Sequence, residues 1–243
     1  MKLLAFDTST EVLSIGVDCD GAQRLHTGAG GAQASFGLIA GVQSLLQQAG
    51  VPMQALDAIV FGAGPGSFTG LRTSCAVAQG LALGAQRPVL PVPSLLAVAE
   101  DARLRTQPQA TALEVLALLD ARMDEVYAAW WGWSDGRWQL RGDTQLCKPE
   151  ALQVDARVQL LAGNVFTVYP GRFAQALGDA ARPCVAALPS AQALLHLAPA
   201  LLQQGGALPP EGALPLYVRD KVAKTTAERM QEKALAAAGV AGA

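Results

Sequence analysis

Histidine and cysteine are scarce in this chain, which has two histidines and four cysteines among its 243 residues. Two histidines are too few to assemble a histidine-based metal site or a proton relay. The cysteines lie far apart and form no CxxC pair, so neither a zinc cluster nor a redox pair is indicated. They are Cys19, Cys75, Cys147 and Cys184. We therefore expect reduced thiols, a cytoplasmic protein and no bound metal.

Charge is also sparse, because charged residues make up 16% of the chain and the formal net charge is −2. A protein that binds nucleic acid by itself normally has a basic surface, so any contact with RNA is expected to be shared with a partner. No segment offers the ~18 consecutive apolar residues that a membrane span needs. The carboxylate of Asp7 comes too early for a signal-peptide apolar region, so none is expected.

An internal duplication organises what the sequence does contain. Residues 2–28 and 114–142 share one pattern, in which an apolar run ends in an Asp, a polar turn follows, and a second apolar run ends in Asp-Gly. The first run ends at Asp7 in one copy and at Asp120 in the other. Apolar runs of this length, split by Asp-Gly, are typical of a three-stranded antiparallel meander.

Helix and strand patterns follow each meander. In the first half they predict a helix over residues 34–49, a strand over 58–62 and a helix over 70–85, before a junction at 88–109. In the second half they predict a strand over 158–162 and helices near 172–178 and 191–204. The repeated unit is therefore β-β-β-α-β-α. Two such units that face each other across a cleft are the layout of the actin-like α/β fold, which Hsp70 and sugar kinases share.

This layout divides the chain into a first lobe, residues 1–105, a second lobe, residues 106–220, and a tail, residues 221–243. The tail is basic and then rich in Ala and Gly, and we expect part of it to be disordered. In the actin-like layout the first turn of each lobe points at the phosphates of a nucleotide. Asp7 and Asp120 would then lie on opposite walls of one cleft, although each could instead cap a tight turn.

The segment GAGPGSFTGLR, residues 62–72, lies directly between a predicted strand and a predicted helix. Glycines allow the backbone to approach a ligand or another chain closely, and a helix N-terminus attracts anions, so the segment suits a phosphate. It lacks the Lys of a Walker A motif and does not match GxGxxG, and Pro65 removes one backbone donor.

Several segments together resemble the TsaB (YeaZ) family. They are LAFDTST (4–10), GPGSFTGLR (64–72) with GLALGA (80–85), LALLDARMDEVYAAW (116–130) and PLYVR (215–219). The matches occur in the right order over nearly the whole chain.

The resemblance implies a non-catalytic subunit required for N6-threonylcarbamoylation of adenosine 37 in tRNAs that read ANN codons. Its expected partners are a TsaD-like catalytic subunit and a TsaE-like ATPase, with tRNA contacted only through the complex and a homodimer left open. No cofactor is expected beyond weak or partner-dependent binding of an adenine nucleotide. A TsaD-like metal site uses two His on a first-lobe helix, and the corresponding residues 33–40 contain none.

Two groups of residues follow from this reading. A vestigial nucleotide cleft is expected at Asp7, Thr8, Ser9, Gly64, Gly66, Ser67 and Asp120. The helix at residues 70–85 has no charge after Arg72, so its outer face packs either on a partner or under the neighbouring helix. The resemblance favours a partner interface, expected at Phe36, Ile39, Leu71, Ser74, Cys75, Ala78, Leu81 and Ala82.

Two other functions stay open at this point. Asp7, Asp120 and the glycine-rich segment would permit an active nucleotide-dependent kinase or ATPase of the same fold. A metal-dependent peptidase is the other alternative, and the shortage of histidine disfavours it.

Overall fold

The structure is a computed structural model that describes residues 1–31, 34–173 and 182–219. The strands are β1 (Lys2–Asp7), β2 (Val12–Cys19), β3 (Ala22–Ala29), β4 (Ala58–Gly64), β5 (Val89–Pro93), β6 (Ala112–Arg122), β7 (Glu125–Ser134), β8 (Arg137–Leu140), β9 (Gln145–Cys147), β10 (Leu160–Gly163) and β11 (Cys184–Val185). The helices are α1 (Ala34–Ala49), α2 (Phe68–Ala85), α3 (Ser94–Thr106), α4 (Val165–Val168) and α6 (Ala191–Gln203), with short 3-10 helices η2 (Met53–Ala55), η3 (Pro149–Ala151) and η4 (Pro210–Gly212).

Two mixed sheets repeat one strand order. The first is β3-β2-β1-β4-β5, and the second, taken in the same sense, is β8-β7-β6-β10-β11 with β9 paired to β7. In both sheets the first three strands are antiparallel, and the last two run parallel to the strand that opens the unit. The duplication predicted from the sequence is thus present in the topology.

The Asp-Gly pairs form the tight turns that the sequence predicts. Asp20 and Gly21 have φ of 54° and 93°, and Asp135 and Gly136 have φ of 51° and 74°. A two-residue hairpin turn of type I′ needs positive φ at both positions, which Asp and Gly tolerate better than most residues. These turns connect β2 to β3 and β7 to β8.

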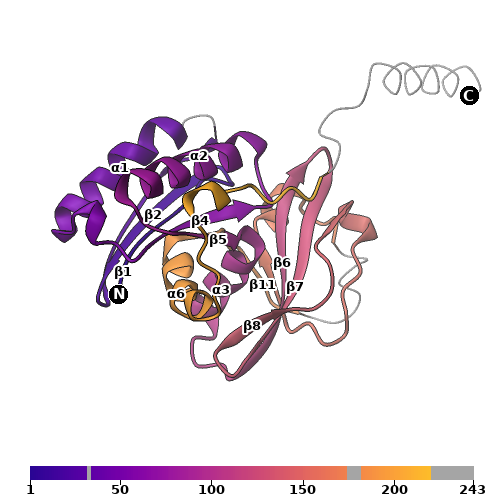
Figure 1. Ribbon diagram of the computed structural model, residues 1–243. Helices are drawn as coiled ribbons and strands as arrows, with labels where there is room; N and C mark the ends of the chain where they lie inside the picture. The colour runs from indigo at the N-terminus through magenta and orange to yellow at the C-terminus, as the bar shows by residue number, and fades with distance from the viewer. Residues whose placement is uncertain (32–33, 174–181, 220–243) are drawn as a thin grey trace, which may run out of the picture.

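Helices and sheets alternate in layers (Figure 1). One core lies between the first sheet and α1 and α2, where Leu38 and Ala78 pack near Phe6 and Phe61. A second core lies between the two sheets and contains α3 and α6. A third lies on the outer face of the second sheet, under residues 152–173.

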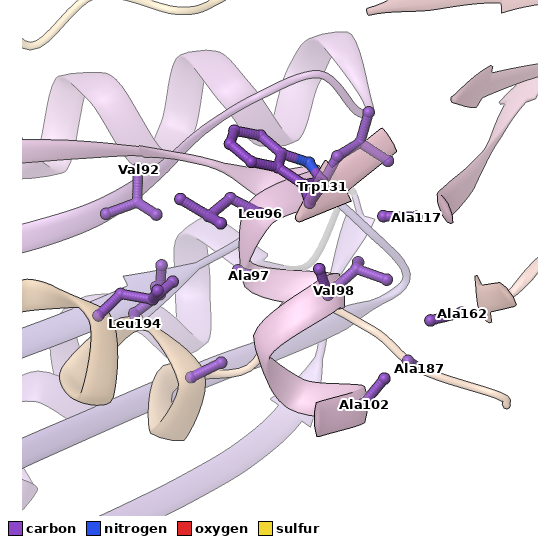
Figure 2. Packing of buried hydrophobic residues seen from close by; sticks show 14 of the residues in the cluster. Val92, Leu96, Ala97, Val98, Ala102, Ala117, Trp131, Ala162, Ala187 and Leu194 are labelled. Atoms are coloured by element: carbon purple, nitrogen blue, oxygen red, sulfur yellow. The ribbon is translucent and has the colours of Figure 1, made fainter. Parts of the chain in front are cut away.

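The central core is built largely from small side chains. Figure 2 shows Leu96 and Ala97 of α3 between Leu194 of α6 and Trp131 of the second sheet. Alanine side chains let the helix and both sheets approach closely. As a result α3 is buried almost all round, including Glu100 at 0% and Arg103 at 3% exposure.

Most predicted elements are confirmed, and the longest of those not predicted are β5 and α3. Helix α1 has the predicted bounds, and α2 begins two residues before the predicted start at residue 70. The junction at residues 88–109 is not a connector, because it contains β5 and α3. The helix expected near 172–178 falls mostly outside the described residues, as does the tail at 221–243.

Helix α6 covers the first sheet although its residues lie in the second half of the chain. It contacts β1, β2 and β4, and Ala191 N donates a hydrogen bond to Ser14 Oγ (2.8 Å). Helix α6 follows β11 in the second half, as α3 follows β5 in the first half, so the two helices are counterparts. Each half therefore has one β-α pair more than the predicted β-β-β-α-β-α unit. The lobe boundaries at residues 105 and 220 stay a prediction.

Candidate functional site

A cavity of about 320 Å³ lies between the two halves of the chain. From the first half it is lined by Ser9, Thr10, Glu11, Gly30, Gly31, Pro65, Gly66, Ser67, Phe68 and Leu71. From the second half it is lined by Leu119, Asp120, Ala121, Arg122, Met123, Tyr127, Asn164, Leu216, Tyr217, Val218 and Arg219. We call it the interlobe pocket.

The glycine-rich segment packs directly on the turn after β1. Ser67 N donates to Ser9 O (2.7 Å), and Thr8 Oγ1 donates to Gly70 O (2.7 Å). A Cβ on Gly70 would lie 1.9 Å from Thr8 O, and one on Gly66 would lie 2.6 Å from Ser9 O. These glycines are therefore needed because the two backbone segments approach closely. The space beside Gly66 and Gly70 is filled by Thr8 and Ser9.

Asp7 is fully buried beneath this contact and does not line the interlobe pocket. Its carboxylate accepts hydrogen bonds from Ser9 N (2.7 Å), Ser9 Oγ (2.6 Å) and Ser94 Oγ (3.3 Å). A Cβ on Gly62 would lie 1.7 Å from Asp7 Oδ2, so Gly62 makes room for the carboxylate. Burial raises the pKa of Asp7 to about 6, against the opposing effect of the hydrogen bonds from Ser9 and Ser94.

Asp7→Asn is expected to remove a pH dependence of stability. Because the pKa of Asp7 in the folded protein, about 6, lies above its ordinary 3.8, the folded state binds this proton more tightly than the unfolded state does. The carboxylate therefore makes the wild type lose stability as pH rises through this range. Between pH 4.5 and 7.5 the wild type should lose about 2 kcal/mol relative to the variant, measured by urea unfolding. If the free energies of unfolding of wild type and Asp7→Asn differed by the same amount at every pH, the pKa of Asp7 would not be raised.

Asp120 lies at the edge of the interlobe pocket, with its side chain 6% exposed. Its carboxylate accepts hydrogen bonds from Tyr169 Oη (2.7 Å) and Arg122 N (2.8 Å), and Arg122 Nη1 lies 3.2 Å from Oδ2. Burial and the hydrogen bond to Asp120 raise the pKa of Tyr169 to about 12. The carboxylate is thus held in one orientation and partly neutralised by its own turn.

The turn after Asp120 has a strained backbone. Arg122, Met123 and Asp124 have φ of 63°, 54° and 60°, a conformation that costs non-glycine residues of order 1–3 kcal/mol each. Arg172 Nη1 holds Asp124 Oδ1 (2.8 Å), and Arg219 Nη2 holds Ala121 O (3.0 Å). These contacts fix a turn that presents Arg122 and Met123 to the pocket.

The structure brings together part of the cleft expected from the sequence. Ser9, Gly66, Ser67 and Asp120 line the interlobe pocket. Asp7, Thr8 and Gly64 do not, because they are buried behind the turn after β1 and in β4. The expectation that Asp7 and Asp120 line opposite walls is corrected accordingly, while a nucleotide at this position stays a prediction.

A segment near the chain end bridges the two halves (Figure 1). Leu216 N donates to Ala63 O (2.7 Å), and Tyr217 accepts from Arg72 Nε (3.2 Å) and stacks on Phe68 with ring centroids 5.7 Å apart. On the other side Arg219 Nη1 pairs with Glu125 (2.7 Å). We call residues 214–219 the strap. In the sequence, PLYVR stands out only through the family resemblance. No local spacing predicts that it contacts residues as distant in the chain as Ala63 and Arg72.

The outer surface of α1 and α2 is almost uncharged and carries exposed apolar residues beside uncharged polar ones such as Gln43 and Gln79. Its exposed residues include Phe36, Ile39, Ala76, Gly80, Leu83 and Gly84, and we call this surface the α1–α2 face. Phe36 is 86% and Leu83 69% exposed. α1 has no charged residue, and Arg72 is the one charge on α2.

Most of the expected interface residues on α2 lie inside the chain. Of the eight, Phe36 and Ile39 are exposed and Leu81 is partly buried. The other five are buried at 6% exposure or less: Leu71, Ser74, Cys75, Ala78 and Ala82. The small-residue stripe centred on Ala78 packs toward β4, and a second stripe, Ala76, Gly80 and Gly84, faces outward. The expected interface at these five positions is therefore corrected.

Within residues 1–31, 34–173 and 182–219, no three His, Cys, Asp or Glu side chains gather into a group that could hold a metal ion. None of the helices in these ranges is long and apolar enough to span a membrane.

Comparisons with known proteins agree with the fold and with the resemblance. The profile of the family described as "TsaD: tRNA N6-adenosine threonylcarbamoyltransferase" matches residues 35–227. Among solved structures, YeaZ from Pseudomonas aeruginosa superposes with a TM-score of 0.78 at 39% sequence identity, covering 89% of this chain and 99% of that chain. The actin-like α/β class is thereby confirmed.

Two relatives carry the same name, "tRNA threonylcarbamoyladenosine biosynthesis protein TsaB". That of Escherichia coli K12 is 34% identical over 229 residues, 92% of this chain and 96% of the relative. That of Haemophilus influenzae is 33% identical over 244 residues, 91% of this chain and 95% of the relative. At this identity and coverage, the chain belongs to the TsaB (YeaZ) family of tRNA threonylcarbamoyladenosine biosynthesis proteins.

Proposed function

We propose that this chain is a non-catalytic subunit for N6-threonylcarbamoylation of adenosine 37 in tRNAs that read ANN codons, and that it acts in the cytoplasm. In this proposal it binds a TsaD-like catalytic subunit through the α1–α2 face. The observation that carries the proposal is the character of that face, which exposes Phe36, Ile39 and Leu83 beside a single charge at Arg72. The centre of a protein interface is depleted of charge and enriched in large apolar side chains.

The outward stripe of α2 supports a helix as the contacting element. A Cβ added at Gly80 or Gly84 would meet nothing within 4 Å, so these positions are bare on the surface. Small residues at a helix contact reduce the distance between helix axes. A second helix could therefore lie close against Ala76, Gly80 and Gly84.

Two observations support a role without catalysis. Helix α1 has no histidine, whereas a TsaD-like metal site would need two at this place. The glycine-rich segment is also packed against Thr8 and Ser9, so its glycines serve the fold and do not form an open phosphate cradle.

The remaining partners follow from the same proposal. A TsaE-like ATPase joins the complex, and the net charge of −2 favours tRNA contact through the complex over binding by this chain alone. In the absence of the catalytic subunit, two copies could pair through the α1–α2 face, because its near lack of charge gives no repulsion between like surfaces.

Gly80→Arg is expected to abolish capture of the TsaD-like subunit in a pull-down while leaving the isolated chain folded. The new side chain would face solvent in the free protein, so Tm should stay within about 2 °C of the wild type. In the complex it would place a long, charged side chain in a tight contact, which should weaken binding about 100-fold or more. Tm and pull-down are measured on the same preparations.

Gln192→Arg is the matched control, because it adds the same charge to the exposed side of α6, away from the α1–α2 face. It should change neither Tm nor binding.

Wild type alone should leave tRNA unmodified, and adding the catalytic subunit and the ATPase should yield the modified nucleoside, detected by mass spectrometry of tRNA digests. Undiminished capture by Gly80→Arg would refute the proposed surface, and modification by the chain alone would refute the non-catalytic role.

A further inference from the structure

A groove of about 500 Å³ lies at the C-terminal end of α2, outside the interlobe pocket. One side comes from the end of α2 and the residues before β5, and the other from the segment that follows α6. That segment reaches α2 here, where η4 contacts the helix (Figure 1). The lining includes Leu83, Arg87, Pro88, Ala207, Leu208 and Pro209, and we call this site the α2-end groove.

The two sides of the α2-end groove are tied together by the backbone. Val89 N donates to Leu208 O (2.9 Å), and Leu208 N donates to Val89 O (2.8 Å). Pro88 and Pro209 have a fixed φ, which limits the freedom of the chain on each side. A site with rigid walls loses little conformational entropy when it binds, so the groove is suited to recognition.

Large apolar side chains are exposed on both sides of the groove. Leu83 is 69% and Leu208 38% exposed, and Pro209 is exposed as well. Helix α1 packs over β2 and β3 and α2 over β4, whereas Leu208 pairs with the edge strand β5. The groove therefore lies on the side of α2 away from α1. Because Leu83 belongs both to the groove and to the α1–α2 face, a protein that covers it fully would contact both surfaces.

Arg87 is the one charged residue in the lining of the groove. Within residues 1–31, 34–173 and 182–219 it forms no ion pair, and its guanidinium donates from Nη2 to Gln54 O while Nε is buried without a partner. The acidic residue that follows Pro210, Glu211, is exposed on η4 and does not line the groove. A guanidinium binds a carboxylate through charge-assisted hydrogen bonds, so an acidic side chain in the occupant would complement Arg87.

We propose that the α2-end groove binds an apolar segment of the TsaD-like catalytic subunit that carries an Asp or Glu side chain opposite Arg87. The interface then continues from the α1–α2 face, across Leu83, onto residues 207–210 of the second half. The identity of the partner rests on the proposed function. Charge pairs fix the register of an interface, so Arg87 sets the position of the partner along α2.

The test is isothermal titration calorimetry of the purified catalytic subunit with the full-length chain. Arg87→Gln removes the positive charge, and Ala207→Glu places in the groove a carboxylate that competes for Arg87 and repels an acidic occupant. Each variant should weaken binding about tenfold. Ala207 is exposed and leaves Arg87 in place, so Ala207→Glu should keep Tm within about 2 °C of the wild type even if Arg87→Gln is less stable.

Arg137→Gln and Ala112→Glu are the matched controls, because both residues are exposed in the second half outside the groove. Neither should change the affinity. Raising NaCl from about 50 to about 500 mM should weaken binding of the wild type more than binding of Arg87→Gln, because salt screens the ion pair.

Wild-type affinity of either folded variant, Arg87→Gln or Ala207→Glu, would overturn the proposal. An equal response of wild type and Arg87→Gln to salt would also overturn it. If Gly80→Arg still loses the catalytic subunit in that case, the proposed function stands and the interface ends at the α1–α2 face. A wild-type chain that does not bind the catalytic subunit would overturn the proposed function as well.

Discussion

Replacing Glu100 with alanine is expected to lower the free energy of unfolding by about 3–5 kcal/mol. The carboxylate of Glu100, on the buried helix α3, accepts hydrogen bonds from Arg103 Nε and Nη2 (both 2.9 Å) and Trp138 Nε1 (2.8 Å), and its Oε1 lies 2.5 Å from His196 Nδ1. Burial acts to raise the pKa of Glu100, but these hydrogen bonds outweigh it and hold the pKa below its ordinary value. Without the carboxylate, the guanidinium of Arg103 would stay buried without its counter-ion.

Asp101→Ala on the same helix is the control for the loss of an ion pair as such. Asp101 pairs with Arg105 (2.6 Å), whose side chain is 49% exposed, so this variant should lose less than about 1 kcal/mol. Urea unfolding of both variants gives the comparison. If both variants lost the same free energy of unfolding, the burial of the Glu100–Arg103 pair would not contribute to the effect of Glu100→Ala.

Gly70→Ala is expected to destabilise the protein by about 3 kcal/mol or more. The added Cβ would lie 1.9 Å from Thr8 O and 2.9 Å from Thr8 C, both of which are backbone atoms that no rotamer change can move. Either the turn after β1 or the first turn of α2 must shift, and the hydrogen bond from Thr8 Oγ1 to Gly70 O would be lost. Thermal and urea unfolding measure the effect.

Gly80→Ala tests the same substitution on the same helix where space is open. Nothing lies within 4 Å of the new Cβ, so the variant should gain about 0.5–1 kcal/mol from the better helix propensity of alanine. Opposite signs at the two positions are the expected result. A tolerated Gly70→Ala would mean that the glycine-rich segment is not held against Thr8.

The sequence predicts the hairpins and the duplication well, because Asp20-Gly21 and Asp135-Gly136 act locally. It does not reveal α3. That helix is buried on nearly every side, so its sequence lacks the alternation of apolar and polar residues that marks a surface helix. Charged residues are normally exposed, so the sequence gives no sign that Glu100 and Arg103 are buried. The two charges pair with each other on the same helix, and the further groups that contact Glu100, Trp138 and His196, come from distant parts of the chain.

The orientation of α2 could not be predicted for a related reason. Its two small-residue stripes, centred on Ala78 and on Gly80, have nearly the same composition, and no charge after Arg72 marks the outer one. Tertiary packing alone decides that Ala78 is buried and Gly80 exposed. In the pocket, Ser9, Ser67 and Asp120 could be predicted from their turns. Tyr127, Arg122 and the strap could not, because only the meeting of the two halves gives them a role.

The position of α6 on the first sheet has a consequence for synthesis on the ribosome. The last strand of that sheet ends at Pro93, but the helix that covers β1, β2 and β4 ends only at Gln203. At usual rates of translation the roughly 100 intervening residues take about 5–20 s to add. Throughout that interval apolar side chains such as Leu3 and Val60 lack their α6 cover. The first half of the nascent chain therefore exposes an apolar sheet face until the second half has emerged.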